Sequence, residues 1–414
     1  MISTATKVAC ALVLVLHLGS IPASARSVPE EVPSTPGEAS SSVTNAAPPA
    51  VPASPPAVRY RELISDIELP PVAGFTTDFS RTVIRASEMA YGGPPKDGIP
   101  AVDRPVLTDP DEADEWLAEN EPVFVVSADG ATHIYPVQIL TYHEIVNDVV
   151  GSTPLSVTYC PLCNSGLAFR RAFDGQVLDF GTTGLLRYSN LIMYDRQTES
   201  WWQQATGEGL AGQYAGYRLE LHPVLMLPWR EARDRFPGAR VLSRDTGNLR
   251  PYSTNPYRGY DSAYQPYLFS GPIPEGPLAP MDRVIDVVVG SESLAVPYSV
   301  LEEHGVFQRE LGGTPVVVFW EPGTASALDT TVIADGRDVG SANAFSAIVD
   351  GRTLSFEHRD DQIRDVETGS TWGISGIALA GELRGARLQP LLGVQHFWFS
   401  YSAFASDGRW SPAE

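Results

Sequence analysis

The chain has 414 residues, and its 29 lysine and arginine residues stand against 50 aspartate and glutamate residues, so the formal net charge is −21. Such an acidic protein is poorly suited to nucleic acid, because phosphate backbones are bound by neutralising them with basic side chains. Three cysteines are too few for a fold that depends on a disulfide framework. Composition therefore excludes two classes of protein and leaves the function open.

The first 25 residues have the pattern of a secretory signal peptide. Lys7 precedes an apolar run from 8 to 18, and the triplet Ala23-Ser24-Ala25 suits signal peptidase. The apolar run is about half of the roughly 20 residues that a membrane span needs, and no later run is long enough. We therefore expect an extracytoplasmic protein, periplasmic or secreted, with no membrane span after cleavage.

Residues 26–58 are rich in proline, alanine and serine without an apolar period, which is typical of a disordered linker. An N-terminal extension of the folded part follows at 59–109. The next expected element is a short helix at 112–119. Then comes a β-hairpin from 123 to 135, joined by the strong two-residue turn Asp129-Gly130.

Pro136 is expected to open a helix with Ile139, His143 and Val146 along one face. A β-rich run at 155–159 then leads into the cysteines. A second Asp-Gly hairpin is expected to join 167–173 to 176–180, and another short helix is expected at 229–236. The pattern predicts an α+β fold made mainly of β-hairpins.

The chain repeats itself internally. Segment 136–161 aligns without gaps with 297–322, and three later blocks recur in the same order. One block, Asp195-Thr198-Ser200-Trp202, matches Asp365-Thr368-Ser370-Trp372. This indicates two similar, duplicated halves, at 110–250 and 281–408, joined by a connector at 251–280 and forming one compact unit or two packed domains.

Two cysteines remain after signal cleavage, Cys160 and Cys163. Thiols three positions apart can form a disulfide, bind a soft metal, or cycle between thiol and disulfide. A disulfide across so short a loop contributes only about 2 kcal/mol in the chain-entropy model. The second half has Glu321 in place of Cys160 and no cysteine. We therefore expect a site in the first half that the fold itself does not require.

The local context of the cysteines disfavours a thioredoxin fold. In a thioredoxin-type site a helix begins at the first cysteine, and the helix dipole lowers the pKa of its thiol. Here residues 165–169 have the pattern of a strand instead. Redox chemistry on another fold stays open.

The leading hypothesis is a transition metal, copper or zinc, bound by Cys160 and Cys163 with His143 as the candidate third ligand, for redox or metal-handling chemistry. His143 also suits a packing role, since His304 stands at the same place in the half without cysteines. Further side chains are candidates for orienting the ligands: Glu144, Asp148, Tyr159 and Asp195.

Two alternatives stay open. The protein could be a metal-free thiol-disulfide oxidoreductase with Cys160 and Cys163 as catalytic thiols. It could also be a non-catalytic binding module with an inert disulfide and a ligand at the seam between the halves. A small molecule or a metal ion is the expected partner, and the sequence leaves open whether the protein is an enzyme.

Five blocks of the sequence together resemble one known family: Glu144-Ile-Val-Asn-Asp148, Val157-Thr-Tyr-Cys-Pro-Leu-Cys163, Met193 to Trp202, Leu242 to Gly247, and His396 to Ser400. They are similar to the bacterial and archaeal family catalogued as domain of unknown function 3179, over about residues 95 to 405. The resemblance implies an exported, internally duplicated protein and carries no activity. The chain departs from the family at Asn164, where other members have glycine or another small residue.

Overall fold

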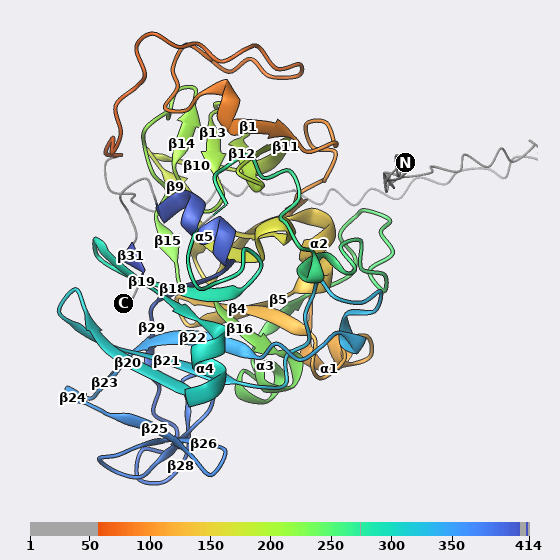
Figure 1. The fold of residues 1–414 in the computed structure, drawn as a ribbon. Coiled ribbons are helices and arrows are strands. Elements are labelled where there is room, and N and C mark those ends of the chain that lie inside the picture. Colours follow the sequence, from red (N-terminus) through yellow and green to blue (C-terminus); the bar gives the residue numbers. More distant parts are fainter. Residues whose placement is uncertain (1–56, 274, 406–410, 413–414) are drawn as a thin grey trace, which may run out of the picture. The chain divides into compact units, whose positions relative to one another are not determined.

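Antiparallel β-hairpins make up most of the fold, which is β-rich α+β with several small sheets and few helices (Figure 1). The computed structural model describes residues 57–273, 275–405 and 411–412. The expected signal peptide, and the expected linker up to residue 56, lie outside this part. The described residues all belong to one unit spanning Ala50–Glu414. No helix within them is long and apolar enough to cross a membrane.

Residues 89–242, which comprise the strands of the first half and three short strands of the N-terminal extension, form three larger sheets and a small hairpin. Their strands, in spatial order, are β15 (Leu221–His222), β8 (Ser165–Arg170), β7 (Thr153–Cys160), β6 (Ile145–Val150) and β2 (Val102–Asp103); β16 (Leu225–Pro228), β4 (Pro122–Ala128), β5 (Ala131–Pro136), β17 (Arg240–Leu242) and β3 (Leu107–Thr108); β1 (Met89–Tyr91), β11 (Phe180–Arg187), β12 (Asn190–Asp195), β13 (Trp201–Gln203) and β14 (Gly209–Ala211); and β10 (Gln176–Val177) with β9 (Ala172–Phe173).

The second half contributes three larger sheets and a small hairpin as well. Their strands are β30 (Leu392–Phe397), β18 (Arg283–Val289), β19 (Glu292–Pro297) and β31 (Ser411–Pro412); β20 (Val306–Leu311), β21 (Thr314–Glu321), β22 (Ser341–Ser346) and β29 (Gln389–Pro390); β25 (Phe356–Arg359), β26 (Gln362–Asp365), β27 (Thr371–Trp372) and β28 (Ala378–Ala380); and β23 (Ile348–Val349) with β24 (Arg352–Thr353).

The helices are short. The α-helices are α1 (Pro110–Asp114), α2 (Val137–His143), α3 (Trp229–Arg235), α4 (Tyr298–His304) and α5 (Trp398–Ala405), and the 3-10 helices are η1 (Ala86–Glu88), η2 (Pro161–Cys163), η3 (Tyr260–Ser262) and η4 (Ile333–Asp335). The expected helix at 229–236 is confirmed as α3. The one expected at 112–119 is instead the five-residue α1, which starts earlier because Pro110 suits a first helical position.

The expected hairpin at Asp129-Gly130 is confirmed by β4 and β5, whose turn residues both have positive φ. The expectation that Val146 continues the helix face of Ile139 and His143 is wrong. Glu144 adopts a left-handed conformation with φ 58° and ends α2, so Val146 lies in β6. The hairpin expected from 167 to 180 is also shorter, since only β9 and β10 pair around Asp174-Gly175.

One hydrogen-bonded turn occurs in both halves with the same residues. The Asp195 carboxylate accepts from the Thr198 backbone N–H at 2.6 Å and from the Trp202 indole at 2.8 Å. The Asp365 carboxylate accepts from the Thr368 N–H at 2.6 Å and from the Trp372 indole at 3.0 Å. Both carboxylates are buried, so each aspartate holds a tight turn against a core tryptophan.

We expect Asp195→Ala and Asp365→Ala each to lower the free energy of unfolding by about 3 kcal/mol, because each leaves a buried indole and a backbone N–H without an acceptor. Urea unfolding of the two variants measures this loss. A loss below about 1 kcal/mol in either variant would contradict the shared role.

The two halves share their cores. One cluster combines Trp229 of the first half with Phe345 and Trp372 of the second. Another combines both cysteines with Phe397 and Phe399 of the second half. The cysteine site therefore lies where side chains of both halves pack together.

Candidate functional site: a buried thiol pair

The two thiols lie on a tight connection between neighbouring strands. Cys160 ends β7 and pairs with Ser165 of β8, while Cys163 ends the intervening η2. Cys160 is 2% exposed and Cys163 is fully buried. Neither takes part in a disulfide. The two thiols influence each other electrostatically, and the pair is a buried dithiol with almost no contact with solvent.

The surroundings keep Cys160 protonated. Burial raises the pKa of the Cys160 thiol well above its ordinary value, and the hydrogen bond and charge of Cys163 and the charge of Glu144 raise it further. The thiol donates to the Ser189 carbonyl with a sulfur-oxygen distance of 3.7 Å. This environment stabilises uncharged forms of the sulfur.

Asn164 closes the cysteine turn in a left-handed conformation, with φ 51° and ψ 39°. Its Oδ1 also accepts the hydroxyl of buried Tyr159 at 3.1 Å. Glycine and asparagine tolerate this conformation best, which gives a physical reason for either residue at this position.

We expect Asn164→Ala to be less stable than Asn164→Gly by about 1 to 2 kcal/mol, because only alanine pays the left-handed penalty of a Cβ. Both variants remove the acceptor of Tyr159, so that loss cancels in the comparison. Urea unfolding of the pair measures the difference, and equal stabilities would contradict it.

Glu144 is a buried acid whose charge acts on the Cys160 thiol. Its side chain is 7% exposed, and its hydrogen-bond partner is the Tyr257 hydroxyl, which donates to Oε1 at 3.4 Å. Burial raises the pKa of Glu144 to about 7, and the bond from Tyr257 opposes the rise only in part. Glu144 can therefore take up or release a proton near neutral pH.

The connector supplies two tyrosines to the thiol site, and these tyrosines were not predicted from the sequence. Tyr257 bonds Glu144, and Tyr260 donates to the Leu162 carbonyl, between the two cysteines, at 2.9 Å. Burial is the main cause that raises the pKa of each phenol; the neighbouring Glu144 and Cys160 raise that of Tyr257 further, and Cys163 raises that of Tyr260 further. The tyrosine-rich composition of 251–280 was the sequence feature that could have indicated them.

The connector itself is fastened to the second half. The Asn255 amide donates to the Ala327 and Thr330 carbonyls, both at 2.9 Å. Fully buried Asp261 pairs with Arg283 and Arg337, both at 3.1 Å. Residues of the second half thus hold in place the segment that covers the thiols of the first.

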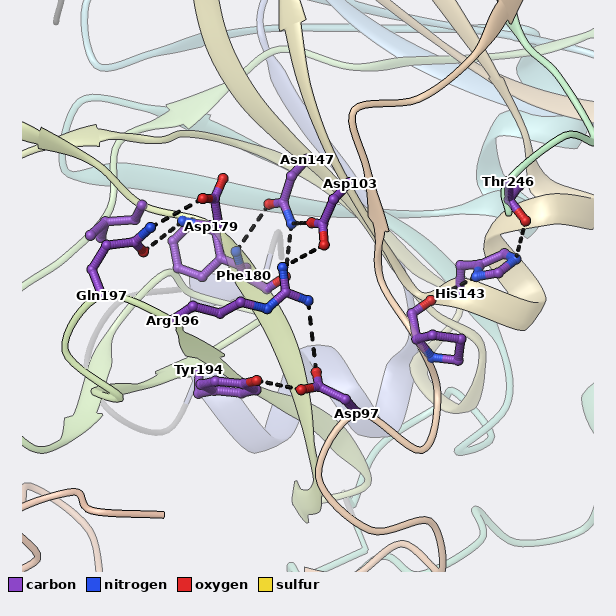
Figure 2. Close-up of polar contacts among 12 residues, drawn as sticks. Asp97, Asp103, His143, Asn147, Asp179, Phe180, Tyr194, Arg196, Gln197 and Thr246 are labelled. Atoms are coloured by element: carbon purple, nitrogen blue, oxygen red, sulfur yellow. Dashed lines mark hydrogen bonds and ion pairs between the residues drawn. The ribbon is translucent and has the colours of Figure 1, made fainter. Parts of the chain in front are cut away.

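Both ring nitrogens of His143 have polar partners within the protein, and Figure 2 shows the contact with Thr246. Its Nδ1 is 2.6 Å from the Pro100 carbonyl, which can only accept, so Nδ1 carries the proton. Its Nε2 then accepts from the Tyr252 hydroxyl at 2.6 Å and lies 3.4 Å from the Thr246 hydroxyl. Burial lowers the pKa of His143, so the ring is neutral at neutral pH.

The other candidate residues divide between the thiol site and the scaffold. Tyr159 and Glu144 lie at the thiols. Asp148 instead accepts from His133 at 2.8 Å and Tyr135 at 2.7 Å, and Asp195 holds its own turn. The neighbouring Arg196 donates to Asp103 at 2.6 Å and faces Asp97, which ties the N-terminal extension to the residue that follows β12 (Figure 2).

A complete metal ligand set is not gathered at the thiols. Within the described part of the chain, no group of three or more histidine, cysteine, aspartate and glutamate side chains is arranged to hold an ion. Tetrahedral zinc needs four donors, of which two thiolates supply half. A soft monovalent ion such as Cu(I) suits thiolate ligands and is the metal that this pair fits best.

A family model described as "Protein of unknown function (DUF3179)" matches residues 96–408. The chain belongs to the DUF3179 family. The DUF3179 match includes both cysteines, Glu144 and the connector tyrosines, so the whole thiol site lies within the family region. No curated protein and no solved structure matches the chain.

Proposed function

We propose that Cys160 and Cys163 form a reversible dithiol-disulfide couple in an extracytoplasmic protein. The observation that carries this proposal is the burial of two neighbouring, unbridged thiols beside a buried acid. A dithiol and a disulfide are both uncharged, so either can occupy such a site without the cost of burying a charge. The signal-peptide pattern of residues 1–25 supports export.

Glu144 is the proton acceptor in this proposal. Oxidation breaks two S–H bonds, forms one S–S bond, and passes two electrons to an external disulfide, which is reduced to two thiols that take up the two protons. The attacking sulfur must first lose its proton, and ionised Glu144 beside Cys160 accepts it. Entry of the external disulfide requires the segment with Tyr257 and Tyr260 to move aside.

A second candidate is a metal site of Cys160 and Cys163, for which the spacing of the thiols on η2 is the supporting observation. A Cu(I) dithiolate carries a net negative charge in a buried position next to Glu144, which disfavours it against the neutral couple. Zinc would need further ligands that the present arrangement does not supply.

One experiment on the reduced protein separates the two candidates. A redox couple predicts that a small disulfide oxidises the protein with loss of two thiols per chain and two mass units, and that reductant restores both. A metal site predicts one equivalent of Cu(I) or zinc by native mass spectrometry after anaerobic reconstitution, lost in Cys160→Ser. Stoichiometric metal that protects both thiols from oxidation would overturn the redox proposal.

The halves are also proposed to be copies of one unit, of which the first acquired or kept the thiols. The supporting features are the equal order of elements and the matching turns. α2 ends at left-handed Glu144 and α4 ends at left-handed Gly305. The carbonyls of these residues accept from Tyr159 at 2.8 Å and from Trp320 at 2.9 Å. Equal losses in Asp195→Ala and Asp365→Ala would support the equivalence.

A further inference from the structure

A cavity of about 480 Å³ lies between the β4–β5 turn and the end of α3. It is lined by residues 127–132, residues 235–239 and Arg387. The first two segments belong to the first half and Arg387 to the second, so the cavity is at the seam. Its volume falls within the range of small-molecule sites, which runs from about 300 to 1,000 Å³.

Two arginines give the cavity a positive wall. The Nε of Arg235 donates to Glu231 Oε1 at 3.1 Å, and its two Nη atoms make no hydrogen bond within the described residues. Arg387 has no acidic partner there, and its guanidinium lies 5.6 Å from the centre of the Phe236 ring. Planar guanidinium groups bind carboxylates through paired N–H donors.

The acid that lines the cavity, Asp129, is already satisfied. Its carboxylate accepts the Ser152 and Thr153 hydroxyls at 2.5 and 2.6 Å. These bonds hold the pKa of Asp129 below its ordinary value, so the carboxylate is ionised and its hydrogen bonds go to residues of the 151–153 turn. Asp129 therefore does not compete for the arginines, and the one carboxylate bonded to them, Glu231, engages only the Nε of Arg235.

Apolar side chains form one part of the wall, with Phe236, Pro237 and three alanines beside the arginines. The Ser127 and Thr132 hydroxyls, which also line the cavity, are hydrogen-bonded to each other at 2.8 Å. From this combination we infer that the cavity binds a small organic carboxylate whose flat apolar body packs on Phe236 and whose carboxylate meets Arg387 and Arg235. This site is separate from the thiol pair and does not depend on its function.

Benzoate is a suitable probe. Benzyl alcohol is the comparison that keeps the ring without the charge, and inorganic phosphate is the comparison that keeps a negative charge without the ring. Calorimetric titration of the full-length protein should show one saturable benzoate site with a dissociation constant below about 10 mM. Raising the salt concentration should weaken it. Arg387→Gln and Arg235→Gln should each weaken binding about tenfold, whereas Arg384→Gln, an exposed arginine in the same segment, should leave it unchanged.

Each other outcome overturns the inference. Absence of saturable benzoate binding removes the site, and equal binding in Arg387→Gln places the probe elsewhere. Phosphate that binds as tightly as benzoate would contradict the apolar part, and benzyl alcohol that binds as tightly would contradict the carboxylate. Unchanged thermal unfolding of the variants shows that the effects do not arise from misfolding.

Discussion

Replacing Glu144 with glutamine is expected to slow oxidation of the Cys160–Cys163 pair by a small disulfide about 100-fold at pH 8. The wild-type oxidation rate should rise with pH through the Glu144 pKa of about 7 and level off roughly one pH unit above it, where Glu144 is almost fully ionised. The oxidation rate of the variant should keep rising about tenfold per pH unit, because only hydroxide remains to accept the proton of the attacking thiol. Both dependences of the oxidation rate on pH are measured by stopping the reaction at timed intervals between pH 5.5 and 9 and alkylating the thiols that remain.

The same substitution should stabilise the fold at pH 8. Because burial raises the pKa of Glu144 to about 7 from its ordinary value of 4.5, the unfolded chain ionises first and folding loses about 3 kcal/mol between these pH values. Glutamine removes that loss, so the gain is present above pH 7 and absent near pH 4. A slower reaction in a more stable protein excludes misfolding as the cause.

Glu321 provides a matched control. It stands at the position that corresponds to Cys160, and burial, followed by the charge of Glu231, raises its pKa to about 7 as well. Glu321→Gln should stabilise the fold at pH 8 and leave the oxidation rate unchanged. An unchanged rate in Glu144→Gln, or an equal decrease in both variants, would contradict the role of Glu144.

Replacing Asp286 with valine is expected to stabilise the protein by about 2 to 4 kcal/mol at pH 7. Asp286 in β18 is fully buried, and neither carboxylate oxygen has a hydrogen-bond partner within the described residues. Burial raises its pKa well above the ordinary value. Valine suits this position of β18 because it is apolar and because β-branched side chains pack well in sheets.

The gain should depend on pH. The unfolded chain ionises Asp286 near pH 4, while the folded protein holds it protonated, so wild-type stability falls as the pH rises above 4. The stabilisation by valine should therefore be small at pH 3.5 and grow toward pH 7. Asp261→Asn is the contrasting variant, because that buried carboxylate is paired with two arginines, and it should destabilise. Loss of stability in Asp286→Val would show that the carboxyl has a partner.

Local sequence signals predicted the parts of the fold that short-range chemistry decides. Asp129-Gly130 predicted its hairpin because both residues accept positive φ. The strand after Cys163 followed from the β-rich pattern, and the thiols were identified as the site candidate. The end of α2 was missed, because left-handed Glu144 is a non-glycine residue in a conformation that sequence rarely signals.

The parts of the site that come from distant segments were not predictable from spacing. Tyr257 reaches Glu144 across 113 positions, and Tyr252 reaches His143 across 109. His143 lies on the expected helix near the cysteine strand, but the Pro100 carbonyl and the Tyr252 hydroxyl occupy its nitrogens. Only the packed fold decides which polar groups meet.

The most direct test of the central proposal is the midpoint potential of the Cys160–Cys163 pair, measured by equilibration in thiol-disulfide buffers at pH 6, 7 and 8. A reversible couple should have a midpoint at pH 7 above about −300 mV, the limit below which structural disulfides typically lie. The midpoint should also fall by about 59 mV per pH unit, because two protons accompany two electrons. A midpoint below that limit would identify an inert structural disulfide, and a potential independent of pH would show that the thiols are already ionised or metal-bound.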